Sequence, residues 1–367
     1  MRTAIVYDRL NKIGGAEQVL IALHDLYPTA TWYTSVWEPT RAPFSADWKV
    51  HASWLNKIPW LRTHHEWIPY LMPFVFESFD LRKYDLVISV GSAEAKGVLT
   101  LPSTPHLHYC LTPTRYLYSH ATEYLSNPLY RLIAHYLRKW DLTASTRPDI
   151  MIAISTQVKK RIKNIYNRES DIIFPPVNTK KFSLTGKSTH RSTESPNNRI
   201  TDYFLVVSRL VPYKKIDVLV RAANLAHKNL VIIGEGSEFK SLSRLAGKTV
   251  TLLGHVSDQV LPSYYHNCLA YLQANEEDFG ISMCEAQAAG KPVIAYGHGG
   301  ACDIVIPGKT GLLLPDNSVD SFATAMLEFD TISYVPDDCR QNAKRFDRSQ
   351  WIKHMQGRIK QICQTTK

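Results

Sequence analysis

Two carboxylates stand close together in the segment Asn275–Gly290, which reads NEEDFGISMCEAQAAG. Glu277 follows an apolar run that predicts a strand, and Glu285 lies inside a helix predicted to open near Gly280. Carboxylates bind sugar hydroxyls tightly because a charged acceptor strengthens the hydrogen bond. Backbone N–H groups at the helix start could also face a phosphate. The alternative is that the three acids before the helix, Glu276, Glu277 and Asp278, only complement the helix dipole.

Two cations follow another predicted strand. The sequence SRLVPYKK places Arg209 and Lys214 after the apolar run Tyr203–Val207. A forked guanidinium and a compact ammonium together can neutralise a diphosphate without a metal ion. A solvated turn rich in cations is the alternative that this segment alone leaves open.

Two glycine turns also stand where strands are predicted to end. Gly14 and Gly15 precede a predicted helix, so their loop could bring an anion to the helix N-terminus or be a simple turn. Gly234 and Gly236 form a second turn, but Phe239 occupies the place of the third glycine of a dinucleotide-binding fingerprint. A nicotinamide cofactor is therefore poorly supported.

The elements that must position these residues are short apolar runs that alternate with helical patterns, which indicates parallel sheets in α/β domains. The predicted strands are Thr3–Tyr7, Leu86–Val90, His106–Leu111, Ile150–Ile154, Tyr203–Val207, Leu230–Ile233, Val250–Leu253, Leu269–Leu272 and Pro292–Ala295. The polar stretch Ser183–Arg199 separates the first four from the rest. We therefore expect two doubly wound, Rossmann-like domains that face a central cleft, with ligands at the carboxyl ends of the strands.

The expected domain boundaries follow from that polar stretch. Residues 1–185 form the predicted N-terminal domain, residues 186–200 the linker, and residues 201–345 the predicted C-terminal domain. The chain ends in a helical pattern over Gln350–Thr366, so residues 346–367 could pack back on the N-terminal domain.

The composition excludes several classes of protein. With 367 residues, of which 44% are hydrophobic and 21% charged, the chain is globular and neither disordered nor fibrous. Its six cysteines include no Cys-x-x-Cys pair, which argues against a disulfide framework and a structural zinc site. Neither a secretory leader nor an apolar run of membrane-spanning length is evident, so we expect a cytoplasmic protein.

The net charge of +10 favours phosphate, anionic lipid or nucleic acid as a partner. No zinc spacing, basic run or RNA-binding aromatic strand supports nucleic acid. The segment Trp54–Phe79 mixes aromatic residues with cations, and the helix predicted within Asn127–Trp140 carries cations around an apolar stripe. Both patterns occur in helices that lie at a membrane interface, although we expect the stripe itself to pack on the sheet.

Together these motifs resemble those of a family 4 glycosyltransferase of the GT-B fold. The resemblance rests on the two cations, the two carboxylates and both glycine turns, together with IFPPVN at Ile173–Asn178 and GHGGACDIVIPGKTGLLLP at Gly297–Pro315. It spans nearly the whole chain, and it implies that residues 1–185 form the acceptor-side domain and residues 201–345 the donor-binding domain. HLHYCLTPTRYLY at His106–Tyr118 and GSAEAKGV at Gly91–Val98 are similar to bacterial mannosyltransferases of O-antigen and exopolysaccharide assembly.

The resemblance implies a role for each matching residue. Arg209 and Lys214 would bind the donor diphosphate, Glu277 would bind hydroxyls of the transferred sugar, and these three would carry catalysis. Glu285 would bind the ribose. The further residues implied in donor binding are Gly14, Gly15, Gly254, His255, Val256, Phe279, Gly280 and Ile281, of which 254–256 would lie along the nucleobase.

The reaction that the resemblance implies is a metal-independent hexosyl transfer that retains the anomeric configuration. The nucleotide sugar is the substrate, and no further cofactor is implied. We expect mannose from GDP-mannose to be moved to a glycan or lipid-linked saccharide in cell-surface polysaccharide synthesis, at the inner face of the cytoplasmic membrane. The alternatives are a UDP-hexose donor and a weakly active scaffold protein that binds nucleotide sugars.

The sequence departs from the family pattern near Leu111. Relatives often carry a histidine there, in a His-Thr-Pro stretch, whereas this chain has Leu111 before Thr112 and Pro113. Either His106 or His108 takes that role from the same strand, or the contact with the sugar is lost.

Overall fold

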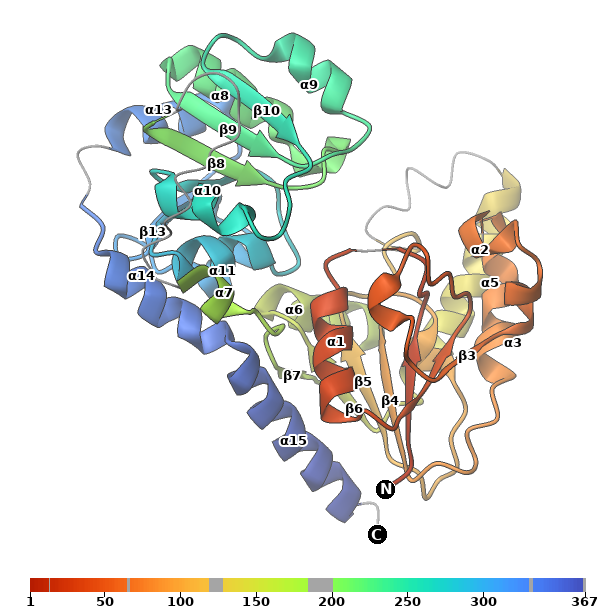
Figure 1. Cartoon of the computed structure of the whole chain (residues 1–367). Helices are drawn as coiled ribbons and strands as arrows, with labels where there is room; N and C mark the ends of the chain where they lie inside the picture. Colours follow the sequence, from red (N-terminus) through yellow and green to blue (C-terminus); the bar gives the residue numbers. More distant parts are fainter. Residues whose placement is uncertain (13, 65–66, 119–127, 184–200, 330–332, 366–367) are drawn as a thin grey trace. The chain divides into compact units, whose positions relative to one another are not determined.

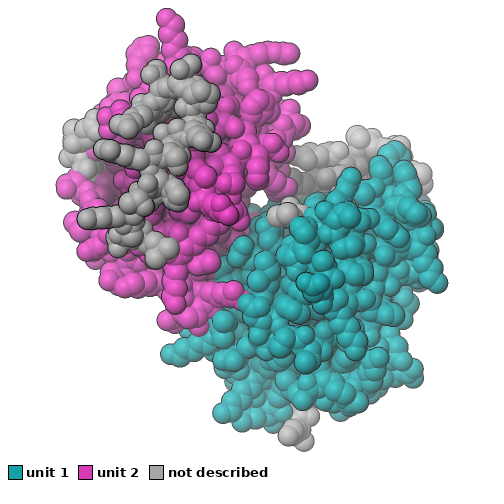
Figure 2. Space-filling model, in the orientation of Figure 1, with its two compact units in different colours: residues 1–176, 351–367 teal, residues 177–350 magenta. Residues whose placement is uncertain are grey.

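The computed structural model describes residues 1–12, 14–64, 67–118, 128–183, 201–329 and 333–365. The chain forms two compact units, coloured separately in Figure 2. Unit 1 contains Met1–Pro176 and Trp351–Lys367, and unit 2 contains Val177–Gln350. The boundary precedes the expected residue 185 because the short helix α7 (Thr179–Ser183) packs against helices α10 and α11 of unit 2. The predicted linker, residues 186–200, lies outside the described residues.

Unit 1 is built on a parallel seven-stranded sheet in the order β3-β2-β1-β4-β5-β6-β7 (Figure 1). Its strands are β1 (Thr3–Tyr7), β2 (Thr31–Thr34), β3 (Val50–Ala52), β4 (Leu86–Gly91), β5 (His106–Cys110), β6 (Ile150–Ala153) and β7 (Asp171–Ile172). Residues of β1, β2, β4, β5 and β6 are almost all buried, as expected for strands that helices cover on both faces.

The helices of unit 1 are α1 (Glu17–Leu26), α2 (Leu61–His64), α3 (Met72–Glu77), α5 (Pro128–Ser145), α6 (Thr156–Tyr166) and α15 (Arg348–Thr365). Helix α3 buries Met72, Val75 and Phe76 in a core shared with β1 and β4. Helix α15 buries Trp351 and Met355. The expectation for the apolar stripe of α5 is wrong in part, because Leu137 is buried but Leu132 and Tyr136 are 69% and 41% exposed.

Unit 2 repeats the architecture with a parallel six-stranded sheet in the order β10-β9-β8-β11-β12-β13. Its strands are β8 (Tyr203–Val207), β9 (Asn229–Ile233), β10 (Val250–Gly254), β11 (Tyr271–Gln273), β12 (Val293–Tyr296) and β13 (Gly311–Leu314). Its other helices are α8 (Ile216–Ala226), α9 (Phe239–Leu245), α10 (Leu261–Asn267), α11 (Ile281–Ala288), α12 (Ala301–Ile304), α13 (Val319–Glu328) and α14 (Pro336–Ala343). Helices α8 and α13 pack on each other and share a core with the sheet.

The strand order of each sheet reverses at one point. In unit 1 the chain builds outward from β1 in one direction and continues from β4 in the other, and in unit 2 the same reversal lies between β8 and β11. Ligands of open α/β sheets bind at such switch points, outside the carboxyl ends of the strands. Each unit therefore has one edge where function is expected.

Among the helices of the described ranges, none combines the length and the hydropathy that crossing a membrane requires.

Candidate functional site

The switch point of unit 2 brings two of the predicted segments together. Arg209 follows β8 after one residue, and Asn275–Glu277 follow β11 after one residue. The two strands are paired neighbours, Tyr271 opposite Leu205, so their carboxyl ends meet at one edge. The two cations and Glu277 thus belong to one edge of one sheet.

Lys214 and Glu277 form an ion pair at this edge. The Lys214 Nζ donates to Glu277 Oε1, and the two side chains are only 12% and 18% exposed. The Gln273 amide, at the end of β11, lies 3.4 Å from the same carboxylate oxygen. Partial burial strengthens such a pair relative to one at the surface.

Arg209 belongs to the same turn but has a different partner. Its Nη2 donates to the Tyr213 hydroxyl at 2.6 Å, and the Lys214 ammonium lies 5.5 Å from the centre of the Tyr213 ring. Tyr213 therefore contacts both cations. Arg209 is exposed, so its guanidinium is accessible from solvent.

A glycine turn lies against the backbone on both sides of Arg209. Gly234 and Gly236 have φ angles of 139° and 159°, and a Cβ on either would come within 1.8 and 2.1 Å of the carbonyls of Ser208 and Leu210. Leu210 N also donates to the Glu235 carbonyl at 2.8 Å. The turn therefore packs against the segment that carries Arg209, which accounts for its glycines without a bound nicotinamide.

A second glycine turn holds the segment that carries Glu277. Gly300 N donates to the Glu277 carbonyl at 2.8 Å, and a Cβ on Gly300 would lie 2.0 Å from the Phe279 carbonyl. Gly280, at φ 101°, is the N-cap of helix α11, whose first residue is Ile281. Phe279 itself is 3% exposed, and its ring packs on Phe346 at 5.5 Å between ring centres, so its side chain belongs to the core.

Glu285 lies one turn into α11 and is tied to α10. The Tyr265 hydroxyl donates to its carboxylate at 2.8 Å. Burial raises the pKa of Glu285, and the nearby Lys181 opposes that rise. Lys181 also forms an ion pair with Asp258 at 3.4 Å, and both of these charges act on Glu285.

The structure does not bring every predicted residue to the Glu277 edge. Gly254 ends β10, two strands away from β8, where its carbonyl accepts from Gly234 N at 2.8 Å. His255 next to it is exposed, and Val256 is partly buried. Asp258 links this loop to the surroundings of Glu285, since its charge acts on that carboxyl group.

The remaining predicted residues lie in unit 1. Gly14 N donates to the Glu17 carboxylate at 2.8 Å, so this N–H already has an acidic partner at the start of α1. A Cβ on Gly14 or Gly15 would meet nothing within 4 Å. Their neighbours therefore give no steric reason for glycine at either position.

Neither histidine of β5 is placed to contact a sugar. His106 and His108 are 0% and 1% exposed, and the Ser89 hydroxyl bonds to both, at 2.7 and 2.9 Å. Both side chains are buried on the same face of the sheet, and both residues precede the carboxyl end of β5, where Leu111 stands. Of the two options that Leu111 left open, the structure removes the one in which these histidines substitute.

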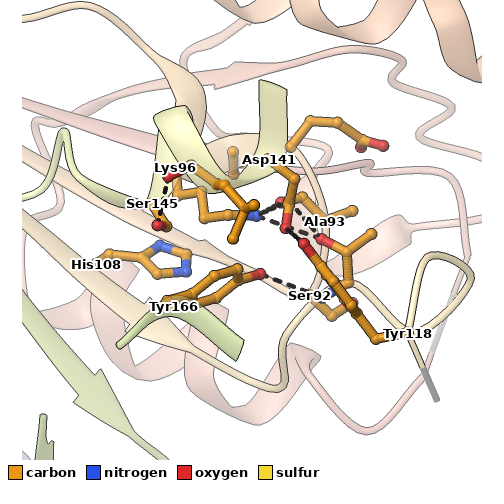
Figure 3. Close-up of polar contacts among 12 residues, drawn as sticks. Ser92, Ala93, Lys96, His108, Tyr118, Asp141, Ser145 and Tyr166 are labelled. Carbon is orange, nitrogen blue, oxygen red and sulfur yellow. Dashed lines mark hydrogen bonds and ion pairs between the residues drawn. The ribbon is translucent and has the colours of Figure 1, made fainter. Parts of the chain in front are cut away.

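The switch point of unit 1 carries a buried polar network that the sequence did not reveal (Figure 3). Lys96, 2% exposed, donates to Asp141 Oδ1 at 2.5 Å and to the Ala93 carbonyl at 2.6 Å. The Tyr118 hydroxyl donates to the other oxygen of Asp141 at 3.1 Å. The available signal was GSAEAKGV, in which a lysine stands among small residues directly after a buried strand.

Residues 190–346 match the family described as "Glycosyl transferases group 1". An uncharacterized glycosyltransferase of Methanocaldococcus jannaschii is 27% identical over 58% of this chain and 59% of its own length. A GDP-mannose-dependent phosphatidylinositol monomannoside mannosyltransferase of Mycobacterium tuberculosis is 31% identical over 49% of this chain and 52% of its own. The chain thus spans just over half the length of these curated relatives.

Solved structures resemble the whole chain. Sucrose-phosphate synthase of Thermosynechococcus elongatus has a TM-score of 0.75 at 17% identity, with 99% of each chain covered. The Anabaena protein HepE, crystallised with UDP and glucose, has a TM-score of 0.73 at 19% identity and covers 98% of this chain and 100% of its own. The fold of the chain is therefore GT-B, and its unit 2 carries the match to glycosyl transferases group 1.

Proposed function

We propose that the chain is a retaining, metal-independent glycosyltransferase that moves a hexose from a nucleotide sugar to a saccharide acceptor. The observation that supports this most is the Lys214–Glu277 pair beside Arg209 at the switch point of unit 2. At this edge of the sheet, two cations that suit a diphosphate lie beside a carboxylate that suits hydroxyl groups.

The charges suggest how the residues would act. As the bond between the sugar and the diphosphate breaks, negative charge grows on the leaving phosphate, and Arg209 and Lys214 would stabilise it most in the transition state. Glu277, held by Lys214, would orient hydroxyls of the sugar. The leaving phosphate would take the proton of the acceptor hydroxyl, so that no side-chain base is needed.

Mannose from GDP-mannose is the donor that we propose first, because the mycobacterial relative at 31% identity is GDP-mannose-dependent. A UDP-hexose is the second candidate, because HepE was crystallised with UDP and with UDP-glucose. Thermal shift with GDP, UDP, ADP and their sugars, without added metal, separates the two, since a ligand of the folded state raises the melting temperature. No shift with any nucleotide would overturn the enzyme proposal itself.

The role of Glu277 is tested by Glu277→Gln, which keeps the size of the side chain and removes its charge. We expect hexosyl transfer to fall by about 100-fold or more, as for loss of a preorganised charged contact. Asp320→Asn is the matched control, because Asp320 is an exposed carboxylate of the same unit. Normal turnover by Glu277→Gln would remove this residue from the mechanism.

We further propose that unit 1 contacts an anionic membrane from the cytoplasmic side, as a lipid-linked acceptor in polysaccharide synthesis would require. Trp60, Trp67 and Phe74 are 52%, 68% and 61% exposed, and Lys57 and Arg62 lie in the same stretch of chain. Exposed aromatic rings beside cations suit the interface of a bilayer.

Co-sedimentation with phosphatidylglycerol vesicles checks the membrane contact. The double variant Trp60→Ala/Trp67→Ala should lose binding, whereas Leu225→Ala, which removes an apolar side chain 56% exposed on unit 2, should retain it. Equal binding by both variants would contradict the proposal.

A further inference from the structure

The switch point of unit 1 is built from the loops after β1 and β4. Asp8 follows β1, and its carboxylate accepts from Ser92 N at 2.8 Å and Ala95 N at 2.9 Å in the loop after β4. A Cβ on Gly91 would lie 2.6 Å from that carboxylate, so a larger residue there would have to displace the Asp8 side chain. The two loops are thereby fixed to one another at the edge where the sheet order reverses.

Arg9 comes next after Asp8 and is held by a buried acid. Its Nη2 donates to Glu94 Oε2 at 3.0 Å, and the exposed fractions are 23% for the Arg9 side chain and 2% for Glu94. The Tyr116 hydroxyl, from the segment after β5, donates to the other oxygen of Glu94 at 2.5 Å. Burial raises the pKa of Glu94, and the Arg9 charge opposes that rise. The buried carboxylate therefore fixes a guanidinium that still reaches solvent.

Two cations at this edge each have an acidic partner. Arg9 pairs with Glu94, and Lys96 pairs with Asp141, as Figure 3 shows for the second pair. Thr114 and Tyr118 add hydroxyl donors to Asp141 at 2.7 and 3.1 Å. Asp8 adds a third carboxylate to these two pairs, so the named cations are not in excess. Such an edge suits the neutral hydroxyls of a saccharide better than a phosphate group, which needs a surplus of cations.

From this arrangement we infer that Arg9 contacts hydroxyls of the saccharide acceptor and that Glu94, which does not reach the ligand, is the positioning residue that orients Arg9. The inference rests on the proposed function and adds the acceptor side to it. Arg209 has the corresponding position in unit 2. One residue separates it from the end of β8, just as one residue separates Arg9 from the end of β1.

The test uses the full chain with its best nucleotide sugar and octyl α-D-mannopyranoside, octyl β-D-glucopyranoside and octyl N-acetyl-β-D-glucosaminide as acceptors. Arg9→Ala should raise the KM for the best acceptor by about 10-fold or more, with the donor KM within about twofold of wild type. Arg9→Lys, which keeps the charge but not the fork, should fall between. Glu94→Gln should raise the same acceptor KM and leave kcat nearly unchanged, whereas a merely structural role would lower the melting temperature without this split.

Arg2→Ala is the matched control. Arg2 precedes β1 and pairs with Asp85 at 2.8 Å, so it repeats the Arg9 pair at the opposite end of the same strand. If Arg9→Ala and Arg2→Ala leave the acceptor KM equally unchanged, the inference is wrong while the glycosyltransferase proposal stands. If wild-type protein transfers no hexose from any donor to any of these acceptors or to water, the proposed function fails and the inference with it.

Discussion

His106 and His108 share the Ser89 hydroxyl in the interior of the sheet of unit 1, and this makes the stability of the fold depend on pH. Burial lowers the pKa of His106 to about 3, and burial likewise lowers the pKa of His108, with Lys96 adding to the effect. At pH values below the pKa of an unfolded histidine, about 6.5, and above the lower folded values, the unfolded chain binds more protons than the folded chain. Stability is therefore complete above that unfolded pKa and falls as the pH decreases.

We expect each histidine to remove about 1.4 kcal/mol of unfolding free energy per pH unit in this range. Urea unfolding at several pH values between 5 and 7.5 measures the slope. His106→Asn should reduce it, and His354→Gln, a substitution of an exposed histidine, should not. An unchanged slope in His106→Asn would contradict the argument.

The two cations of unit 2 give a prediction on binding. Removing Arg209 or Lys214 should each weaken nucleoside diphosphate binding by about 1.5–3 kcal/mol, the usual range for a hydrogen bond to a charged group. Lys214→Met should also release Glu277 from its ion pair, whereas Arg209→Met should leave that pair intact. Calorimetry with the diphosphate that gives the largest thermal shift measures both, and full affinity in either variant would contradict the assignment.

The residue types of this site could be predicted from the sequence, but their contacts could not. Lys214 and Glu277 are 63 positions apart, and they meet only because β8 and β11 are neighbours in the sheet. The sequence suggested a phosphate contact for Gly14, yet the structure pairs its N–H with Glu17. Local spacing predicts which chemistry a segment can offer, while the strand order decides which segments cooperate.

At the scale of elements, two glycines should respond to alanine in opposite ways. Gly300→Ala places a Cβ 2.0 Å from the Phe279 carbonyl, so the loop that carries Glu277 must shift. We expect a loss of about 1–3 kcal/mol in stability together with a loss of transfer. Gly357 lies in the middle of α15 on its exposed face, and a Cβ there would have nothing within 4 Å.

Gly357→Ala should therefore raise stability by about 0.5–1 kcal/mol, the usual gain for replacing glycine within a helix. Chemical denaturation of both variants, followed by activity in native buffer, checks the pair. Unaltered transfer in Gly300→Ala would mean that the turn does not position Glu277.

The sequence predicted long, apolar elements well and short ones poorly. Strands β1 and β8 lie at the predicted residues, and the predicted C-terminal helix is α15 within two residues at its start. Strands β2, β3, β7 and β13 were missed. Asp171–Ile172 has two residues, Val50–Ala52 is partly exposed, and Gly311–Leu314 begins with glycine, so none of these three carries a clear strand pattern.

At the scale of the whole molecule, the last helix completes unit 1. Trp351 is 1% exposed and meets the Tyr109 ring edge-on, at 6.1 Å between ring centres. Trp351→Ala should destabilise unit 1 by about 3–5 kcal/mol, as for a large cavity in a core. Nucleotide binding by unit 2 should persist, and Trp60→Ala, at a 52% exposed position, should cost little. Hydrogen exchange resolves the two units, and equal protection of β5 in both variants would contradict the prediction.

Unit 1 is thus a discontinuous domain, assembled from residues 1–176 and 351–367 with all of unit 2 inserted between them. On a ribosome the seven-stranded sheet is synthesised first, but its covering helix emerges last, after another complete domain. Because chains lengthen by only about 5–20 residues per second, the sheet must wait many seconds with the surface around Tyr109 uncovered. The nascent chain would present that apolar surface to chaperones throughout the synthesis of unit 2.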